Sequence, residues 1–197
     1  DVYKRQLMGW LGTIAMAGHQ VALNLASLTF MVPLGISQAT AVLVGQGVGR
    51  EDPPGARRAA GAGLLLGVVF MTVTAMIFLF SPGLLARIYT GEAAVLALAV
   101  ALIPLAGVFQ VFDGLQVVAS GVLRGIGDTR SPMLLNLLGF WCIGMPVGLW
   151  LGFGTPMGPR GLWWGLVLGL AAVSLLLLVR VRVRMGQELQ RIDMDSA

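Results

Sequence analysis

FQVFDGLQVVASGVLRGIGDTRSP, residues 109–132, contains the features that determine how this chain folds. It begins inside a long apolar run and ends in a short charged loop. Asp113 is the only carboxylate in any of the long apolar runs of the sequence. An Asp at the centre of a membrane-spanning helix costs about 2.5–3.5 kcal/mol on insertion scales, so such a residue indicates a functional site.

The polar residues around Asp113 share one side of the helix that this stretch predicts. They lie within a stripe about 120° wide when placed at helical spacing. The members of the stripe are Gln110, Asp113, Gln116 and Ser120. We expect this polar face to point to a cavity or to another helix and away from lipid.

The composition indicates an all-α polytopic membrane protein. Hydrophobic residues make up 57% of the chain and charged residues 11%, whereas soluble domains carry about 25% charge. The one cysteine, Cys142, excludes a disulfide framework and a cysteine-rich metal site, and we expect it to be a buried structural thiol. The net charge of +4 is explained by arginines at membrane boundaries, so we expect no nucleic-acid partner.

Uncharged runs bounded by charge define the expected spans. Residues 1–6 are polar, unlike the apolar run that begins at Leu7, and are interpreted as a terminal scar or the torn end of a longer chain. Residues 7–183 form the membrane part, and residues 184–197 form a cytoplasmic tail. A remnant of one helix is expected at residues 7–11. Five full spans are expected at residues 15–48, 59–80, 93–123, 132–151 and 162–179, with loops between them that include residues 49–58.

Several local features refine these spans. Pro33 and Pro146 are expected to interrupt their helices, and Ser131 is expected to cap the fourth span. Glycines at 161, 165 and 169 repeat every four residues, a spacing that permits close helix packing. Each of the two loops that combine Asp with Arg is expected to hold a local ion pair with a helix cap.

The arginines indicate the orientation of the chain in the membrane. One side holds nine of them: Arg50, Arg57, Arg58, Arg124, Arg130, Arg180, Arg182, Arg184 and Arg191. The other side holds only Arg87 and Arg160. Because arginine is enriched on the cytoplasmic side, the C-terminus is expected to be cytoplasmic. An aromatic belt at the outer interface is expected at Trp10, Trp150, Trp163 and Trp164.

Two long motifs carry a resemblance to a known family. They are LGTIAMAGHQVALNLASLTFMVPLGISQATAVLVGQGVG at residues 11–49 and FQVFDGLQVVASGVLRGIGDTRSPM at residues 109–133. From residue 8 to residue 178 the chain resembles the C-terminal lobe of the multidrug and toxic compound extrusion (MATE) family, in particular its NorM-like bacterial branch. The resemblance implies one half of a two-lobe, twelve-helix transporter, here the end of helix 7 and helices 8–12.

The resemblance also assigns expected roles to single residues. Asp113 matches the acid of helix 10 that serves cation coupling, and no metal is expected beyond Na⁺ at this residue. Phe109 stands where the family often has Tyr, which removes a hydroxyl ligand and favours protons over sodium. Gln20 and Asn24 match polar positions that face the central cleft. The candidates to contact substrate or line the cleft are Gln20, Asn24, Phe109, Gln110 and Gln116. Hydrogen bonding between helices explains the four polar residues equally well.

His19, the only histidine, could sense pH, although a hydrogen-bonding role near a helix start explains it better.

Three functions remain open from the sequence. The first is a cation-coupled antiporter, using H⁺ or Na⁺ and no cofactor, that exports cationic amphipathic compounds from the bacterial cytoplasmic (inner) membrane. Its partners would be the small-molecule substrate, membrane lipid and the missing N-terminal lobe. The second is a lipid-linked saccharide flippase, disfavoured because no Arg or Lys lies within a span. The third is a membrane-embedded enzyme, disfavoured because the sequence lacks a catalytic set such as Ser–His–Asp.

The orientation is testable by chemical labelling. In a Cys142→Ala background, an impermeant thiol reagent added to intact cells should modify a cysteine placed at Thr155 and spare one placed at Pro54. The reason is the asymmetry of the arginines. The reverse labelling pattern would show that the chain is inserted the other way round.

Overall fold

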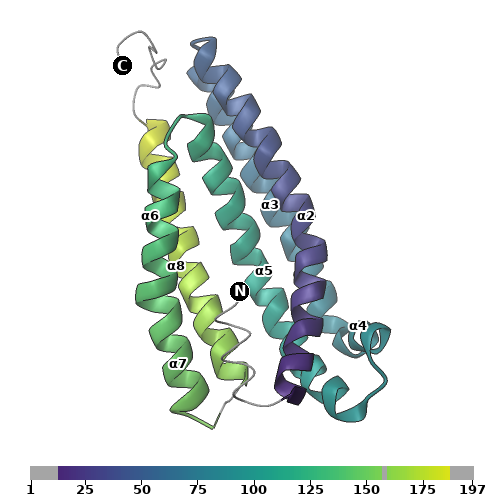
Figure 1. Ribbon diagram of the computed structural model, residues 1–197. Coiled ribbons are helices and arrows are strands. Elements are labelled where there is room, and N and C mark those ends of the chain that lie inside the picture. The colour runs from purple at the N-terminus through teal and green to yellow at the C-terminus, as the bar shows by residue number, and fades with distance from the viewer. Residues whose placement is uncertain (1–12, 157–158, 187–197) are drawn as a thin grey trace.

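The fold is a bundle of long helices. The structure, a computed structural model, describes residues 13–156 and 159–186 (Figure 1). Five helical segments in these ranges are long and apolar enough to cross a membrane. They are α2 (Thr13–Gly49), α3 (Pro53–Phe80), α5 (Ala93–Gly125), the segment Arg130–Phe153, and α8 (Pro159–Gly186). The predicted all-α class with five full spans is confirmed, and the expected remnant at residues 7–11 lies outside the described residues.

Helix α5 occupies the middle of the bundle. It runs between α2 and α3 on one side and α8 on the other (Figure 1). Several of its buried apolar side chains belong to two clusters, one around Leu102 and Ile103, the other around Val122 and Leu123. Because other helices cover α5 on several sides, its polar residues must either bond to protein groups or lie on a side of α5 that is not covered.

The start of α3 differs from the expected loop. Only residues 50–52 separate α2 from α3, so most of the expected loop at residues 49–58 is helical. Asp52 is the N-cap, and its Oδ1 accepts a hydrogen bond from the amide of Gly55 at 3.0 Å. Pro53 then fits the first turn, where its missing N–H costs nothing. The short helix α4 (Pro82–Tyr89) comes after α3.

The fourth span begins with a different cap from the one expected. Helix α6 (Arg130–Leu138) starts one residue before Ser131, so the prediction that Ser131 caps it is wrong. Asp128 instead accepts hydrogen bonds from the backbone amide of Ser131 at 3.2 Å and from its hydroxyl at 2.9 Å. A carboxylate offers two acceptor atoms, and it therefore serves both donors at once.

Proline affects the two expected sites differently. Helix α2 continues through Pro33 without a break. The fourth span changes instead to a π-helix, η1 (Gly139–Gly144), directly before Pro146, and resumes as α7 (Met145–Phe153). A proline cannot donate to the preceding turn, and a π-helical turn absorbs that mismatch. Cys142 lies in η1 with an exposed side chain, so the expectation of a buried thiol is wrong.

Charged residues join the ends of distant elements on one side of the bundle. Oδ2 of Asp128 lies 2.9 Å from Nη2 of Arg180 and 3.4 Å from Nε of Arg184, both in the last turns of α8. The expected local pair with Arg130 is therefore replaced by a pair with α8, because α8 continues as a helix beyond residue 179. Burial acts to raise the pKa of Asp128, but the hydrogen bonds from Ser131 and Arg180 hold this pKa below its ordinary value.

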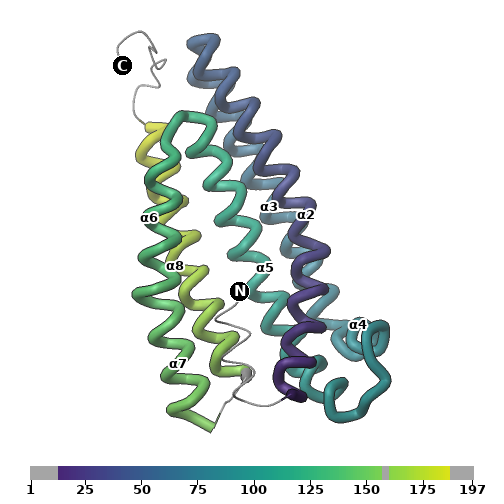
Figure 2. The backbone as a smooth tube through the Cα atoms, viewed as in Figure 1, coloured from purple at the N-terminus to yellow at the C-terminus, as the bar shows by residue number. Residues whose placement is uncertain are grey.

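Glycines form the contact between α7 and α8, which run side by side (Figure 2). A Cβ added to Gly165 would lie 2.2 Å from Cα of Gly148 in α7, and one added to Gly169 would lie 2.7 Å from Cα of Gly144 at the end of η1. The backbones touch directly at these points. The prediction of close packing from the four-residue glycine repeat is confirmed.

Replacing Gly165 by Ala should therefore force α7 and α8 apart. We expect the unfolding free energy in mixed micelles to fall by about 1–3 kcal/mol, the usual cost of overpacking. Gly61→Ala is the matched control, because nothing lies within 4 Å of the added Cβ. Equal effects of the two substitutions on unfolding would contradict the glycine contact.

Candidate functional site

Asp113 lies in the interior of α5 and is partly exposed. Gln110 precedes it by about one turn, and Gln116 follows it by about one turn, so the three side chains share one side of the helix. The surroundings of Asp113 are therefore set by where these two glutamines bind.

Gln110 ties α5 to α2. Its side chain is 1% exposed, and its Oε1 accepts a hydrogen bond from the hydroxyl of Thr29 at 2.7 Å. Its Nε2 has no hydrogen-bond partner among the residues that the structure describes. Thr29 lies in α2, and sequence reasoning missed it because one Thr in an apolar helix gives no signal of its partner.

Gln116 ties the same side of α5 to α6. Its Nε2 donates to Oδ1 of Asn136, and Nδ2 of Asn136 donates in turn to the carbonyl of Pro132 at 2.8 Å. Asp113 lies at a helical angle between those of Gln110 and Gln116. Asp113 therefore lies on the side of α5 between the contact with α2 and the contact with α6.

A second polar contact joins α2 to α5 near the charged end of the bundle. The hydroxyl of Ser37, which is fully buried, donates to the carbonyl of Val117 at 2.7 Å. Nη2 of Arg124 donates to the same Ser37 oxygen at 3.0 Å. Gly121 makes this possible, since a Cβ there would lie 2.5 Å from the carbonyl oxygen of Ser37. The position of Asp113 along α5 is therefore held on both sides of the residue.

The polar residues of α2 fall into two groups. Nε2 of Gln20 donates to Oδ1 of Asn24 at 3.3 Å, Asn24 is exposed, and Gln20 is partly exposed. His19 is 1% exposed and lies inside the bundle. Gln20 and Asn24 therefore remain on the surface of the described bundle, whereas His19 belongs to its interior.

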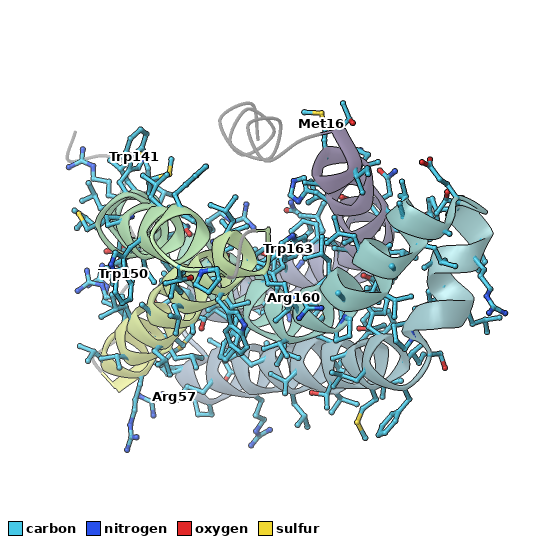
Figure 3. All side chains as sticks on the ribbon, turned by 90° about the horizontal axis from the view of Figure 1, so that it is seen from below. Met16, Arg57, Trp141, Trp150, Arg160 and Trp163 are labelled. Carbon is cyan, nitrogen blue, oxygen red and sulfur yellow. The ribbon has the colours of Figure 1, made fainter. Side chains whose placement is uncertain are left out.

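Three aromatic rings meet between α2, α5 and α8. The ring of His19 lies 5.6 Å from that of Trp163, and the ring of Phe109 lies 5.9 Å from it, both with the rings edge to face. Trp163 is 1% exposed, so its expected place in the outer aromatic belt is wrong. Figure 3 shows Trp163 inside the bundle, in contrast to Trp150 at its edge. Phe109 contributes to this packing one turn before Asp113.

The residue types near Asp113 limit which cations the site can bind. Within residues 13–156 and 159–186, no group of three His, Cys, Asp or Glu could hold a metal ion together. A single partly exposed carboxylate can instead bind a proton or a monovalent cation, or pair with a cationic compound.

Comparisons with known proteins agree with this architecture. The sequence-family model MatE matches residues 6–150, which is most of the chain. The chain belongs to the MatE family. It is 46% identical over 182 residues to the multidrug resistance protein NorM of Burkholderia vietnamiensis, covering 90% of this chain and 39% of that protein. It is 41% identical over 201 residues to the multidrug resistance protein PmpM of Pseudomonas aeruginosa, covering 97% of this chain and 42% of that protein.

Solved MATE structures share the fold. The eukaryotic MATE transporter AtDTX14 superposes with a TM-score of 0.82 at 25% identity, over 86% of this chain and 38% of that one. The outward-facing conformation of a multidrug resistance MATE family transporter superposes with a TM-score of 0.85 at 19% identity. This match covers 94% of this chain and 42% of that one. The chain thus spans about two fifths of the length of these relatives. The relatives named here are multidrug resistance proteins, and the solved structures are MATE transporters.

Proposed function

We propose that this chain is the C-terminal lobe of a cation-coupled antiporter that exports cationic, amphipathic compounds in exchange for H⁺ or Na⁺. The observation that carries the proposal is the placement of Asp113, partly exposed in an apolar helix and flanked by glutamines bound to α2 and α6. The relatives named as multidrug resistance proteins support an antiporter over a flippase.

The mechanism follows from having one carboxylate for two cations. Either the coupling ion or the cationic substrate can neutralise Asp113, and each displaces the other, because two cations cannot share one negative charge inside the membrane at low cost. The bonds of Gln110 to α2 and of Gln116 to α6 keep this side of α5 away from lipid. Phe109, which has no hydroxyl, cannot add a ligand for sodium, and this favours protons as the coupling ion.

The opposing lobe is proposed to cover the exposed side of α2. Gln20 and Asn24 lie there, together with Met16 and Met31, which are 38% and 63% exposed. Flexible methionine side chains suit contacts with varied compounds. Transport would require the N-terminal lobe, since alternating access in repeat-built transporters moves one half against the other.

The proposed location is the bacterial cytoplasmic (inner) membrane, with several spans and a cytoplasmic C-terminus. The end of the bundle that holds Asp128 and the last turns of α8 also holds most arginines of the described residues. This distribution supports the orientation. We propose residues 7–183 as the membrane lobe and residues 184–197 as its cytoplasmic tail.

Asp113→Asn in the full-length transporter should abolish efflux of a cationic dye driven by an imposed proton or sodium gradient. Asn keeps the size and part of the hydrogen bonding, but it removes the charge that binds the coupling ion. Because a neutral amide is less costly than a carboxylate in a membrane, expression should be unchanged. The measurement is dye efflux from proteoliposomes at equal protein content.

Glu92→Gln is the matched control, because it removes one exposed carboxylate from the start of α5, where its side chain caps nothing, and leaves Asp113 in place. We expect it to retain coupled efflux. Wild-type efflux in the Asp113→Asn protein would overturn the proposal.

A further inference from the structure

The arginines at the charged end of the bundle differ in their partners. Arg180 and Arg184 are paired with Asp128, and Arg124 donates to Ser37. Among the described residues at this end, five exposed arginines have no carboxylate within ion-pair distance: Arg50, Arg57, Arg58, Arg130 and Arg182. The enrichment of arginine on the cytoplasmic side accounts for arginines at this end. It does not explain why some are paired and others are not.

Arg57 connects the helix that carries Arg58 to the helix that carries Arg182. Its Nε donates to the carbonyl of Met185 at 2.8 Å, which joins the first turns of α3 to the last turn of α8. Arg182 lies three residues before Met185 and so on the same side of α8, while Arg58 is the neighbour of Arg57. The bond through Nε leaves the two terminal nitrogens of Arg57 to bind an anion. Arg57 and Arg182 therefore lie beside the contact between α3 and α8, and Arg58 lies on the adjoining exposed face of α3.

The surface below these arginines is apolar. Leu65 lies seven residues after Arg58 on the same side of α3, and Leu175 lies seven residues before Arg182 on the same side of α8. The two leucines are 65% and 59% exposed. Arg58 and Arg182 therefore each have an exposed leucine about two turns deeper in the membrane. This arrangement suits a ligand with a charged head and apolar tails.

This surface lies apart from the proposed transport site. Figure 3 shows Arg57 at the edge of the bundle away from Met16, the residue of α2 on the side proposed to meet the opposing lobe. The residues that tie Asp113 to its neighbours belong to α2 and α6, whereas this surface is built by α3 and α8. A ligand here would not compete with an exported compound.

We propose that Arg57, Arg58 and Arg182 bind the phosphate of an anionic phospholipid, whose acyl chains lie along the exposed leucines of α3 and α8. Guanidinium groups bind phosphate through paired N–H donors, and clustered arginines at a membrane boundary attract anionic lipid. The bound lipid joins α3 to α8 at their ends. It thus reinforces the contact that Arg57 makes with the Met185 carbonyl.

The test compares two lipids with the same acyl chains, phosphatidylglycerol and phosphatidylcholine. The detergent-solubilised chain is titrated with each lipid, and bound lipid is counted by native mass spectrometry. We expect phosphatidylglycerol to bind more tightly. The double variant Arg58→Gln/Arg182→Gln should weaken this binding by about fivefold for each arginine removed and leave phosphatidylcholine binding unchanged. Both side chains are exposed, so folding should not be affected.

Arg87→Gln/Arg160→Gln is the matched control, because it removes the same charge at the other end of the bundle. It should leave phosphatidylglycerol binding unchanged. Equal binding of the two lipids by the wild-type chain, or an equal loss in both double variants, would overturn the proposal. Inorganic phosphate that binds as tightly as phosphatidylglycerol would also overturn it, since the acyl chains would then contribute nothing.

Discussion

Hydrocarbon offers a carboxyl group no hydrogen bond, and the position of Asp113 inside an apolar helix imposes this constraint on the whole bundle. Helix α5 must keep one side away from lipid along its length. The bonds from Thr29 to Gln110 and from Gln116 to Asn136 fix that side by joining α5 to α2 and to α6. Asp113 is thereby positioned by its neighbours' contacts, on the side of α5 where we propose that its charge binds a cation.

The remaining contacts keep this arrangement rigid. Glycines let α7 and α8 touch through their backbones, and Asp128 links the start of α6 to the end of α8. Arg57 links the start of α3 to the same end. The contacts of Asp128 and Arg57 lie at the membrane boundary, where water lowers the cost of charge. The contacts in the interior of the bundle are apolar packing and hydrogen bonds between polar groups. The proposed lipid would add a further tie between α3 and α8, away from the side that meets the opposing lobe.

Hydropathy and charge predicted the class, the number of spans and the polar side of α5, because these follow from the cost of placing charge in a bilayer. The glycine contact of α8 also followed from its four-residue spacing. Predictions from the sequence were wrong where the partner of a residue is distant in the chain. Asp128 was expected to pair locally but binds arginines of α8. Trp163 was expected at the interface but packs on His19 and Phe109. Such partners depend on tertiary packing, which residue spacing does not encode.

In the proposed mechanism, the coupling ion and the exported compound exchange at one carboxylate. This exchange can be measured by adding a cationic substrate to the full-length transporter in detergent and counting the protons or ²²Na⁺ released. We expect substrate binding to displace the coupling ion in the wild type, and we expect the Asp113→Asn protein to release none. Release of the same amount of ion by the Asp113→Asn protein would contradict exchange at Asp113.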